Sequence, residues 1–147
     1  MTNNICIYHG GCRDGIGAAY AVWKKLGTNC IYYGASHNNR PPNCEGMNVY
    51  LVDFCYSQDT LLQILDEAAS VTILDHHKTT SEDVGYLLEA NVVSGVIDFT
   101  RSGAVIAWNW FHRTRVPLLL QYIQDADVHK YILPRTKEVL LALDSYP

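Results

Sequence analysis

The stretch Val71-Thr72-Ile73-Leu74-Asp75-His76-His77 decides how this chain is interpreted. Its first four residues are apolar or β-branched, which is typical of a buried strand. The strand then ends in one carboxylate and two adjacent imidazoles, groups that bind metals or exchange protons. Two neighbouring histidines are costly to bury without partners, so this arrangement indicates a functional site at the end of the strand.

The same pattern recurs along the chain. Three other short apolar runs also end in a histidine or an aspartate: residues 5–8 before His9, residues 49–52 before Asp53 and residues 92–97 before Asp98. Sequence with helical spacing follows each of these runs. This alternation predicts a doubly wound α/β fold, with a mainly parallel sheet of about five strands and helices on both faces. Because ligands bind outside the carboxyl ends of such strands, we expect these acids and histidines to converge.

Spacing and capping residues predict the remaining elements. Ile16, Tyr20 and Trp23 share one apolar face of a helix predicted over residues 15–26, whose small first-turn residues allow close approach to the sheet or to a ligand. The other expected elements are a strand at residues 30–33, a loop at 37–48, a helix capped by Ser57, a helix at 82–88, a helix capped by Ser102, and two final helices that begin at Pro117 and Pro134.

Composition bounds the class of protein. The 147 residues are 48% apolar and 18% charged, which predicts one globular domain over residues 1–147. The net charge is −4 and basic residues form no run, so we expect no long nucleic acid as a partner. No apolar run reaches bilayer length, the first residues lack a secretion signal, and five scattered cysteines form no CxxC pair. These features predict a cytoplasmic protein without a membrane partner.

Five residues form a constellation suited to divalent metals: His9, Asp14, Asp53, His76 and Asp127. Hard cations such as Mn²⁺ and Mg²⁺ prefer carboxylate oxygens, and Mn²⁺ also accepts imidazole. A two-metal site needs one bridging carboxylate and separate ligands for each ion. Without metals, the same acids would repel one another and raise one another's pKa values.

Four segments resemble the motifs of the DHH phosphoesterase family, which is named for its Asp-His-His motif. They stand in the family's order over nearly the whole chain, at residues 8–19, 52–57, 74–79 and 122–127. The resemblance implies the N-terminal domain of a DHH phosphoesterase and a metal-dependent phosphohydrolase. Such an enzyme would cleave phosphoester bonds of a small nucleotide or short oligonucleotide by hydroxide attack at two Mn²⁺ ions, with Mg²⁺ as the other candidate.

The resemblance also implies a metal-binding role for each of the five residues. His9 and Asp14 would bind separate ions, and Asp53 would bridge the two ions. His76 and Asp127 would complete the shell of the second ion.

Further residues would act on the substrate if the resemblance holds. Asp75 would orient the histidines, and His77 would contact the scissile phosphate or its leaving oxygen. Arg101, Ser102 and Gly103 resemble a family segment at a helix start, where backbone amides and a hydroxyl suit an anion. Arg101 is expected to pair with a second phosphate.

Two positions stay open at this point. Cys12 stands where many family members place a further metal-binding aspartate, so it is either a metal ligand or a small buried residue. Asp125 competes with Asp127 for the fourth motif, and we expect Asp127 to be the ligand.

Two alternative functions fit the same residues. The first is an inorganic pyrophosphatase or polyphosphatase, for which the cations near the motifs are Arg13, Lys78 and Arg101. The second is a module that captures a nucleotide without turning it over. Many family members carry a second C-terminal domain, so we expect either a single-domain member or a truncated chain. Apolar surface that such a domain would cover makes a homodimer a further expectation.

Overall fold

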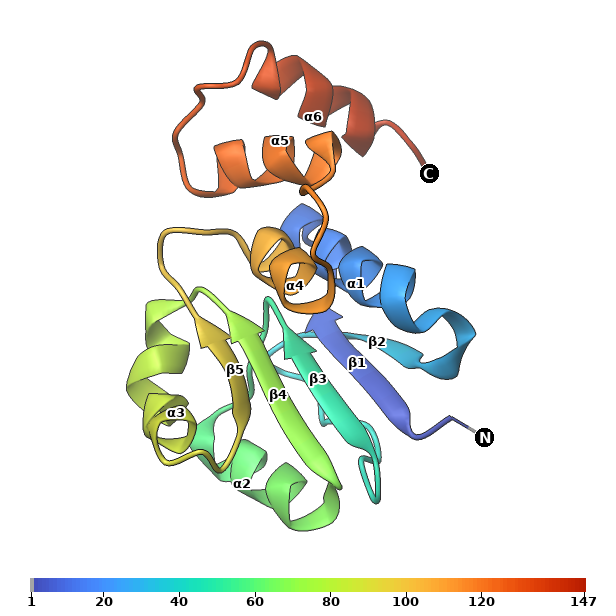
Figure 1. Cartoon of the computed structure of the whole chain (residues 1–147), viewed down its shortest axis with the longest axis vertical. Helices are drawn as coiled ribbons and strands as arrows, with labels where there is room; N and C mark the ends of the chain where they lie inside the picture. Colours follow the sequence, from blue (N-terminus) through green and yellow to red (C-terminus); the bar gives the residue numbers. More distant parts are fainter. Residues whose placement is uncertain (1) are drawn as a thin grey trace.

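The computed structural model describes residues 2–147 and contains one five-stranded sheet, in which all strands are parallel (Figure 1). The strand order is β2-β1-β3-β4-β5. The strands are β1 (Asn4–His9), β2 (Ile31–Ala35), β3 (Asn48–Val52), β4 (Ser70–Asp75) and β5 (Ser94–Ile97). The chain reverses its direction of winding between β1 and β3, the point where open α/β sheets form their crevice.

Helices cover both faces of the sheet, which confirms the predicted doubly wound α/β fold (Figure 1). On one face lie α2 (Gln58–Glu67) and α3 (Lys78–Glu89), and on the other lie α1 (Arg13–Leu26) and α4 (Gly103–Phe111). A short 3₁₀ turn, η1 (Gly27–Asn29), follows α1, while α5 (Leu118–Asp127) and α6 (Thr136–Asp144) pack beyond α1 and α4. No helix within residues 2–147 has the length and apolar character needed to cross a membrane.

The core is divided into two parts by the sheet. Leu51 in β3 packs in the core beneath α2 and α3, and its neighbour Val52 packs in the core beneath α1 and α4. Successive side chains of a strand point to opposite faces, so a strand buried on both faces needs an unbroken apolar run. The apolar runs before His9, Asp53 and Asp75 are the buried strands β1, β3 and β4, whereas the run before Asp98 is the partly exposed edge strand β5.

The buried face of α1 differs from the face that its large apolar residues indicated. Ile16, Tyr20 and Trp23 are 56%, 42% and 51% exposed, whereas most buried residues of this helix are small. A Cβ added to Gly17 would lie 3.0 Å from the Cβ of Ala104. Close contact between α1 and α4 therefore selects the small face for burial and leaves the large apolar side chains outside.

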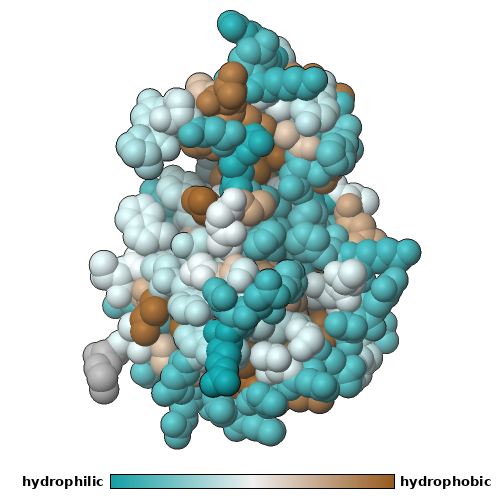
Figure 2. Space-filling view, turned by 180° about the vertical axis from the view of Figure 1, so that it is seen from behind, coloured by the Kyte–Doolittle hydropathy of each residue, from teal (hydrophilic) through white to brown (hydrophobic). Residues whose placement is uncertain are grey.

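Two of these outward side chains border an apolar cavity of about 550 Å³ between α1, α5 and the end of α6. Ile16 and Tyr20 line it together with Leu119 and Leu143. Figure 2, which views the molecule from behind, shows hydrophobic side chains reaching the surface in the upper region that α5 and α6 form. The homodimer expected from exposed apolar surface stays a prediction.

Several predicted boundaries were displaced. The third helix begins at Lys78 instead of residue 82, and the last strand begins at Ser94 instead of residue 92. Pro117 is the N-cap of α5, one residue before the helix. The prediction that Pro134 begins the final helix was wrong, because Arg135 adopts a left-handed conformation and α6 starts after it.

Candidate metal centre

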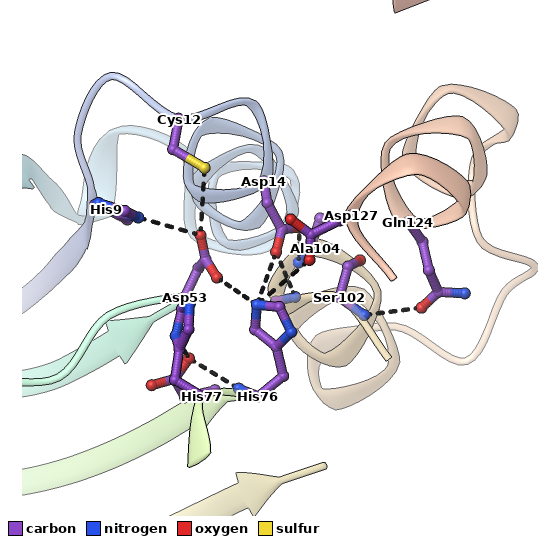
Figure 3. A network of polar contacts seen from close by, with 12 residues as sticks. His9, Cys12, Asp14, Asp53, His76, His77, Ser102, Ala104, Gln124 and Asp127 are labelled. Atoms are coloured by element: carbon purple, nitrogen blue, oxygen red, sulfur yellow. Dashed lines mark hydrogen bonds and ion pairs between the residues drawn. The ribbon is translucent and has the colours of Figure 1, made fainter. Parts of the chain in front are cut away.

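Most of the acids and histidines that follow the strands meet at one edge of the sheet (Figure 3). Asp98, which was also expected there, pairs with Arg101 instead. His9 ends β1, Asp53 follows β3, and His76 follows β4. Two residues on helices join them there, Asp14 in the first turn of α1 and Asp127 at the last position of α5. Because the three strands are parallel neighbours, residues up to 67 positions apart in sequence converge at this edge.

Asp53 lies at the centre of this cluster and is 1% exposed. Its Oδ1 is 3.0 Å from Nε2 of His76. Its Oδ2 is 3.8 Å from Nδ1 of His9 and 3.8 Å from Sγ of Cys12 (Figure 3). The two oxygens of one carboxylate thus face different partners, which is the arrangement that a bridging ligand requires.

The donor atoms form three groups, of which the group of Asp53, Asp75, His76 and His77 shares one residue with each of the other two. The other two, the first group and the second group, hold the six predicted metal ligands. In the first group, the donors of His9, Cys12 and Asp53 lie within 4.8 Å of one another, and in the second group those of Asp14, His76 and Asp127 do the same. The structure therefore brings together all six predicted metal ligands and puts His9 and Asp14 in separate groups. Each of these two groups could hold one cation.

The second group contains an unsatisfied oxygen. Oδ2 of Asp127 is buried and has no hydrogen bond within the described part of the chain. It lies 3.5 Å from Nε2 of His76, which is also 3.3 Å from Oδ2 of Asp14. Leaving a buried carboxylate oxygen without a donor costs free energy, so this oxygen is available to a cation.

Burial and mutual repulsion give these carboxylates unusual acidities. Burial raises the pKa of Asp53 to about 7, and the neighbouring charge of Asp14 adds to the rise. Burial and the charge of Asp14 also raise the pKa of Asp127. Burial by itself lowers the pKa of His76, but the carboxylates of Asp14 and Asp53 outweigh it and raise that pKa to about 10. The cluster therefore strongly favours positive charge at its centre.

The first group presents neutral donors beside Asp53. Burial and the nearby ring of His77 lower the pKa of His9, so its imidazole is neutral and keeps a free lone pair for a cation. Burial also raises the pKa of the Cys12 thiol, which favours its protonated form. His9 is therefore better prepared than Cys12 to act as a ligand, and metal binding by Cys12 stays a prediction.

Asp53 is held in a strained conformation. Its φ is +52°, in the left-handed region that costs a non-glycine residue about 1–3 kcal/mol. Its backbone amide donates a 2.9 Å hydrogen bond to the carbonyl of Leu74 in the neighbouring strand. A Cβ added to Gly103 would lie 2.5 Å from the Cβ of Asp53. The start of α4 therefore presses against Asp53 and depends on a glycine at this contact.

Asp14 caps the N-terminus of α4. Its Oδ2 accepts a hydrogen bond from the amide of Gly103 at 2.8 Å, and its Oδ1 accepts one from the amide of Ala104 at 2.9 Å. Burial opposes ionisation of this carboxyl, but His76 and the two amides hold its pKa below the ordinary value. The helix terminus thus orients a metal-ligand candidate of the chain itself.

This contact occupies one of the backbone amides expected to bind an anion at residues 101–103. The amide of Gly103 is engaged by Asp14, and the hydroxyl of Ser102 accepts a hydrogen bond from the amide of Val105. The amide of Ser102 donates to Oε1 of Gln124 at 3.0 Å, so the backbone amides of both residues are engaged within the protein, and substrate binding at this segment stays a prediction. Arg101 donates from Nε to Oδ2 of Asp98 at 2.8 Å, so its pairing with a second phosphate stays a prediction.

Asp75 is fully buried and contacts the two histidines that follow it in the sequence. Its Oδ1 accepts a hydrogen bond from the amide of His76 at 2.8 Å and lies 2.7 Å from Nδ1 of His77. Its Oδ2 accepts one from the hydroxyl of Thr80 at 2.6 Å. These contacts fit the expected role of Asp75 in orienting the histidines. The sequence analysis missed Thr80, because only the early start of α3 brings this residue toward Asp75.

The structure separates the two aspartates at the end of α5. Asp125 accepts hydrogen bonds from the amides of Ile132 and Leu133 and from the hydroxyl of Thr136, so it fixes the loop between α5 and α6. Asp127 points into the cluster (Figure 3). The preference for Asp127 as the metal-ligand candidate is thereby supported by geometry.

One solved structure has a similar fold, and none of the comparisons with known proteins assigns an activity. No protein-family model matches this chain. It is 27% identical over 154 aligned positions to "Uncharacterized protein R106" of Acanthamoeba polyphaga mimivirus, an alignment that covers 93% of this chain and 36% of that protein. An uncharacterized protein from Helicobacter pylori G27, solved by crystallography, is similar with a TM-score of 0.65 and 15% identity, over 90% of this chain and 44% of that one. The chain thus spans about a third of the length of the viral relative.

Proposed function

We propose that this chain is a metal-dependent phosphohydrolase of the DHH type, which cleaves a phosphoester bond in a small nucleotide or a short oligonucleotide. One observation carries the proposal: buried Asp53 directs one oxygen toward His76 and the other toward His9 and Cys12. The two groups that hold the six predicted ligands therefore meet at this carboxylate, which belongs to the first group and lies 3.0 Å from His76 of the second. This arrangement suits two cations that clamp a phosphoryl group.

The residues of the cluster fit such cations. Carboxylate oxygens and imidazole nitrogens are the donors that Mn²⁺ accepts, and Mg²⁺ would draw on the carboxylates. The unsatisfied Oδ2 of Asp127 and the raised pKa of Asp53 both indicate a deficit of positive charge. When bound, two divalent ions would offset the charge of the phosphate and lower the pKa of an attacking water.

His77 is suited to act on the phosphate. Its side chain is 45% exposed, and its Nδ1 is held 2.7 Å from Oδ1 of buried Asp75. This hydrogen bond and the charge of Asp75 raise the pKa of His77 above its ordinary value, which favours the protonated ring. With Nδ1 occupied by Asp75, Nε2 is left to donate a hydrogen bond or a proton to the phosphate or its leaving oxygen.

A metal-by-substrate screen tests the proposal. The substrates are bis(4-nitrophenyl) phosphate, a dinucleotide and inorganic pyrophosphate, each with Mn²⁺, Mg²⁺ or EDTA. We expect Mn²⁺-dependent cleavage of the two esters and a rate about 100-fold lower in Asp53→Asn, since the bridging position contributes several kcal/mol. Asp66→Asn is the matched control, because Asp66 is exposed on α2 outside the donor groups and should leave the rate unchanged.

Three outcomes would contradict the proposal. Equal rates in the wild-type protein and Asp53→Asn would exclude the bridging role. Release of phosphate from pyrophosphate alone would favour the pyrophosphatase alternative. Tight retention of a nucleotide without any product would favour the binding module.

A further inference from the structure

A cavity of about 300 Å³ opens directly beside the candidate metal centre. Cys12, Asp14 and Asp127 form the wall that it shares with the two donor groups. Its other walls are formed by Arg13, Ile123, Ala126, His129, Tyr131 and Leu140. A volume near 300 Å³ is at the small end of natural ligand sites, so the cavity suits one compact group attached to a phosphate.

The aromatic part of this cavity is held rigidly by Asp125. The backbone carbonyl of Asp125 accepts hydrogen bonds from the amides of Lys130 and Tyr131, while its carboxylate holds the next part of the loop. His129 and Tyr131 have φ values of +55° and +49°, a region that aromatic residues rarely adopt. A loop fixed in this way presents a preformed wall, which lowers the ordering cost of binding a ligand.

Tyr131 lies at the junction of two cavities. A second cavity of about 170 Å³ shares four lining residues with the first: Arg13, Ala126, Tyr131 and Leu140. The Tyr131 side chain is 45% exposed, and Nζ of Lys137 lies 5.4 Å from its ring centroid. An exposed ring beside aliphatic side chains is a surface on which a flat heteroaromatic group can stack.

The same walls are poorly suited to a chain of phosphates. Each phosphate of such a chain needs cations or N–H donors, yet Ile123, Ala126 and Leu140 offer only apolar side chains. The guanidinium of Arg13 already lies 3.4 Å from the carboxylate of Asp144. The chemistry of the cavity therefore favours an aromatic base over additional phosphates next to the metal centre.

We propose that this cavity is a base subsite, in which the nucleobase of a nucleoside phosphate stacks on Tyr131 while its phosphate reaches the metal centre. The inference rests on the proposed phosphohydrolase function and narrows its substrates to nucleoside phosphates. It assigns Tyr131 a role in specificity and leaves the chemical step to the cluster around Asp53.

Isothermal titration calorimetry of the Mn²⁺-loaded protein tests the inference with adenosine 5′-monophosphate and ribose 5-phosphate, which differ only in the base. The nucleotide should bind the wild-type protein about tenfold more tightly, because stacking on one aromatic ring has this order of effect. Tyr131→Ala should reduce the ratio of the two affinities to about one, and Tyr131→Phe, which keeps the ring, should retain it. Tyr86→Ala is the matched control, because Tyr86 is 47% exposed on α3 and does not line either cavity.

A wild-type protein that binds both ligands equally would overturn the base subsite, and so would an unchanged preference in Tyr131→Ala. Hydrolysis of bis(4-nitrophenyl) phosphate, which contains no base, is measured on the same samples. A preference for the nucleotide without any hydrolysis would remove the phosphohydrolase proposal and support the subsite. Hydrolysis without that preference would remove the subsite alone.

Discussion

Replacing Asp53 with asparagine should stabilise the metal-free protein and abolish most of its response to Mn²⁺. The carboxylate of Asp53 is 1% exposed and lies in a cluster with Asp14 and Asp127. The amide of asparagine has nearly the same shape as a protonated carboxyl and carries no charge. The substitution therefore removes repulsion in the folded state together with one cation ligand.

The pKa of Asp53 sets the size of this effect. Folding raises it from the ordinary 3.8 to about 7, which costs about 4 kcal/mol of unfolding free energy when both states are ionised. The cost is absent below about pH 4, grows as the pH rises toward 7 and is complete above pH 7. The opposing effect of His76 is already contained in this pKa. The carboxamide also turns a buried NH₂ group toward Nδ1 of His9, which lies 3.8 Å from the carboxylate, and a buried donor without a partner costs about 1–3 kcal/mol. We therefore expect a net gain of about 2 kcal/mol at pH 8.

Thermal unfolding followed by circular dichroism at pH 8 measures both effects. In EDTA, the variant should melt about 5 °C above the wild-type protein, given about 2–4 °C per kcal/mol for a chain of this size. Mn²⁺ at about 100 times its Kd should stabilise the wild-type protein by about 2.7 kcal/mol, or about 5–10 °C. The variant should show less than half of that rise.

Two results would refute the reasoning. A variant that melts below the wild-type protein in EDTA would show that ionised Asp53 does not carry the assigned repulsion. An equal Mn²⁺ response in both proteins would show that Asp53 is not a ligand. Asp98→Asn is the control, because the carboxylate of Asp98 bonds Thr100 and Arg101 and its loss should leave the Mn²⁺ response intact.

Three further substitutions test the structural role of Asp125, the contact of Gly103 with Asp53, and the proton transfer assigned to His77. Asp125→Asn should lower the unfolding free energy in urea by about 2–4 kcal/mol while the Mn²⁺ response persists, and loss of that response would contradict a purely structural role. Gly103→Ala should lower the unfolding free energy by about 1–3 kcal/mol and weaken Mn²⁺ binding in calorimetry, because the new Cβ would displace Asp53. Unchanged Mn²⁺ binding would argue against the contact between residue 103 and Asp53. His77→Gln should reduce kcat on bis(4-nitrophenyl) phosphate by about 10²–10⁴-fold with the Mn²⁺ response retained, and an unaltered kcat would exclude His77 from the proton transfer.

The candidate site was predictable to the extent that its donors follow strands. His9, Asp53 and His76 each come directly after an apolar run, and parallel strands bring their carboxyl ends to one edge. The choice between Asp125 and Asp127 was harder, because residues two apart point about 200° away from each other around a helix. Only the direction in which α5 packs decides which of them faces the cluster and which fixes the following loop.

The sequence by itself determined the alternation of strands and helices and the acids and histidines that end the strands, since both depend on runs of neighbouring residues. The tertiary structure decided which partners these groups meet. It buried the small face of α1 and left Ile16 and Trp23 outside, and it paired Asp14 with amides of α4 that lie 89 and 90 positions further along the chain. Local spacing shows that residues share a face, but burial and hydrogen bonding depend on which distant element packs against that face.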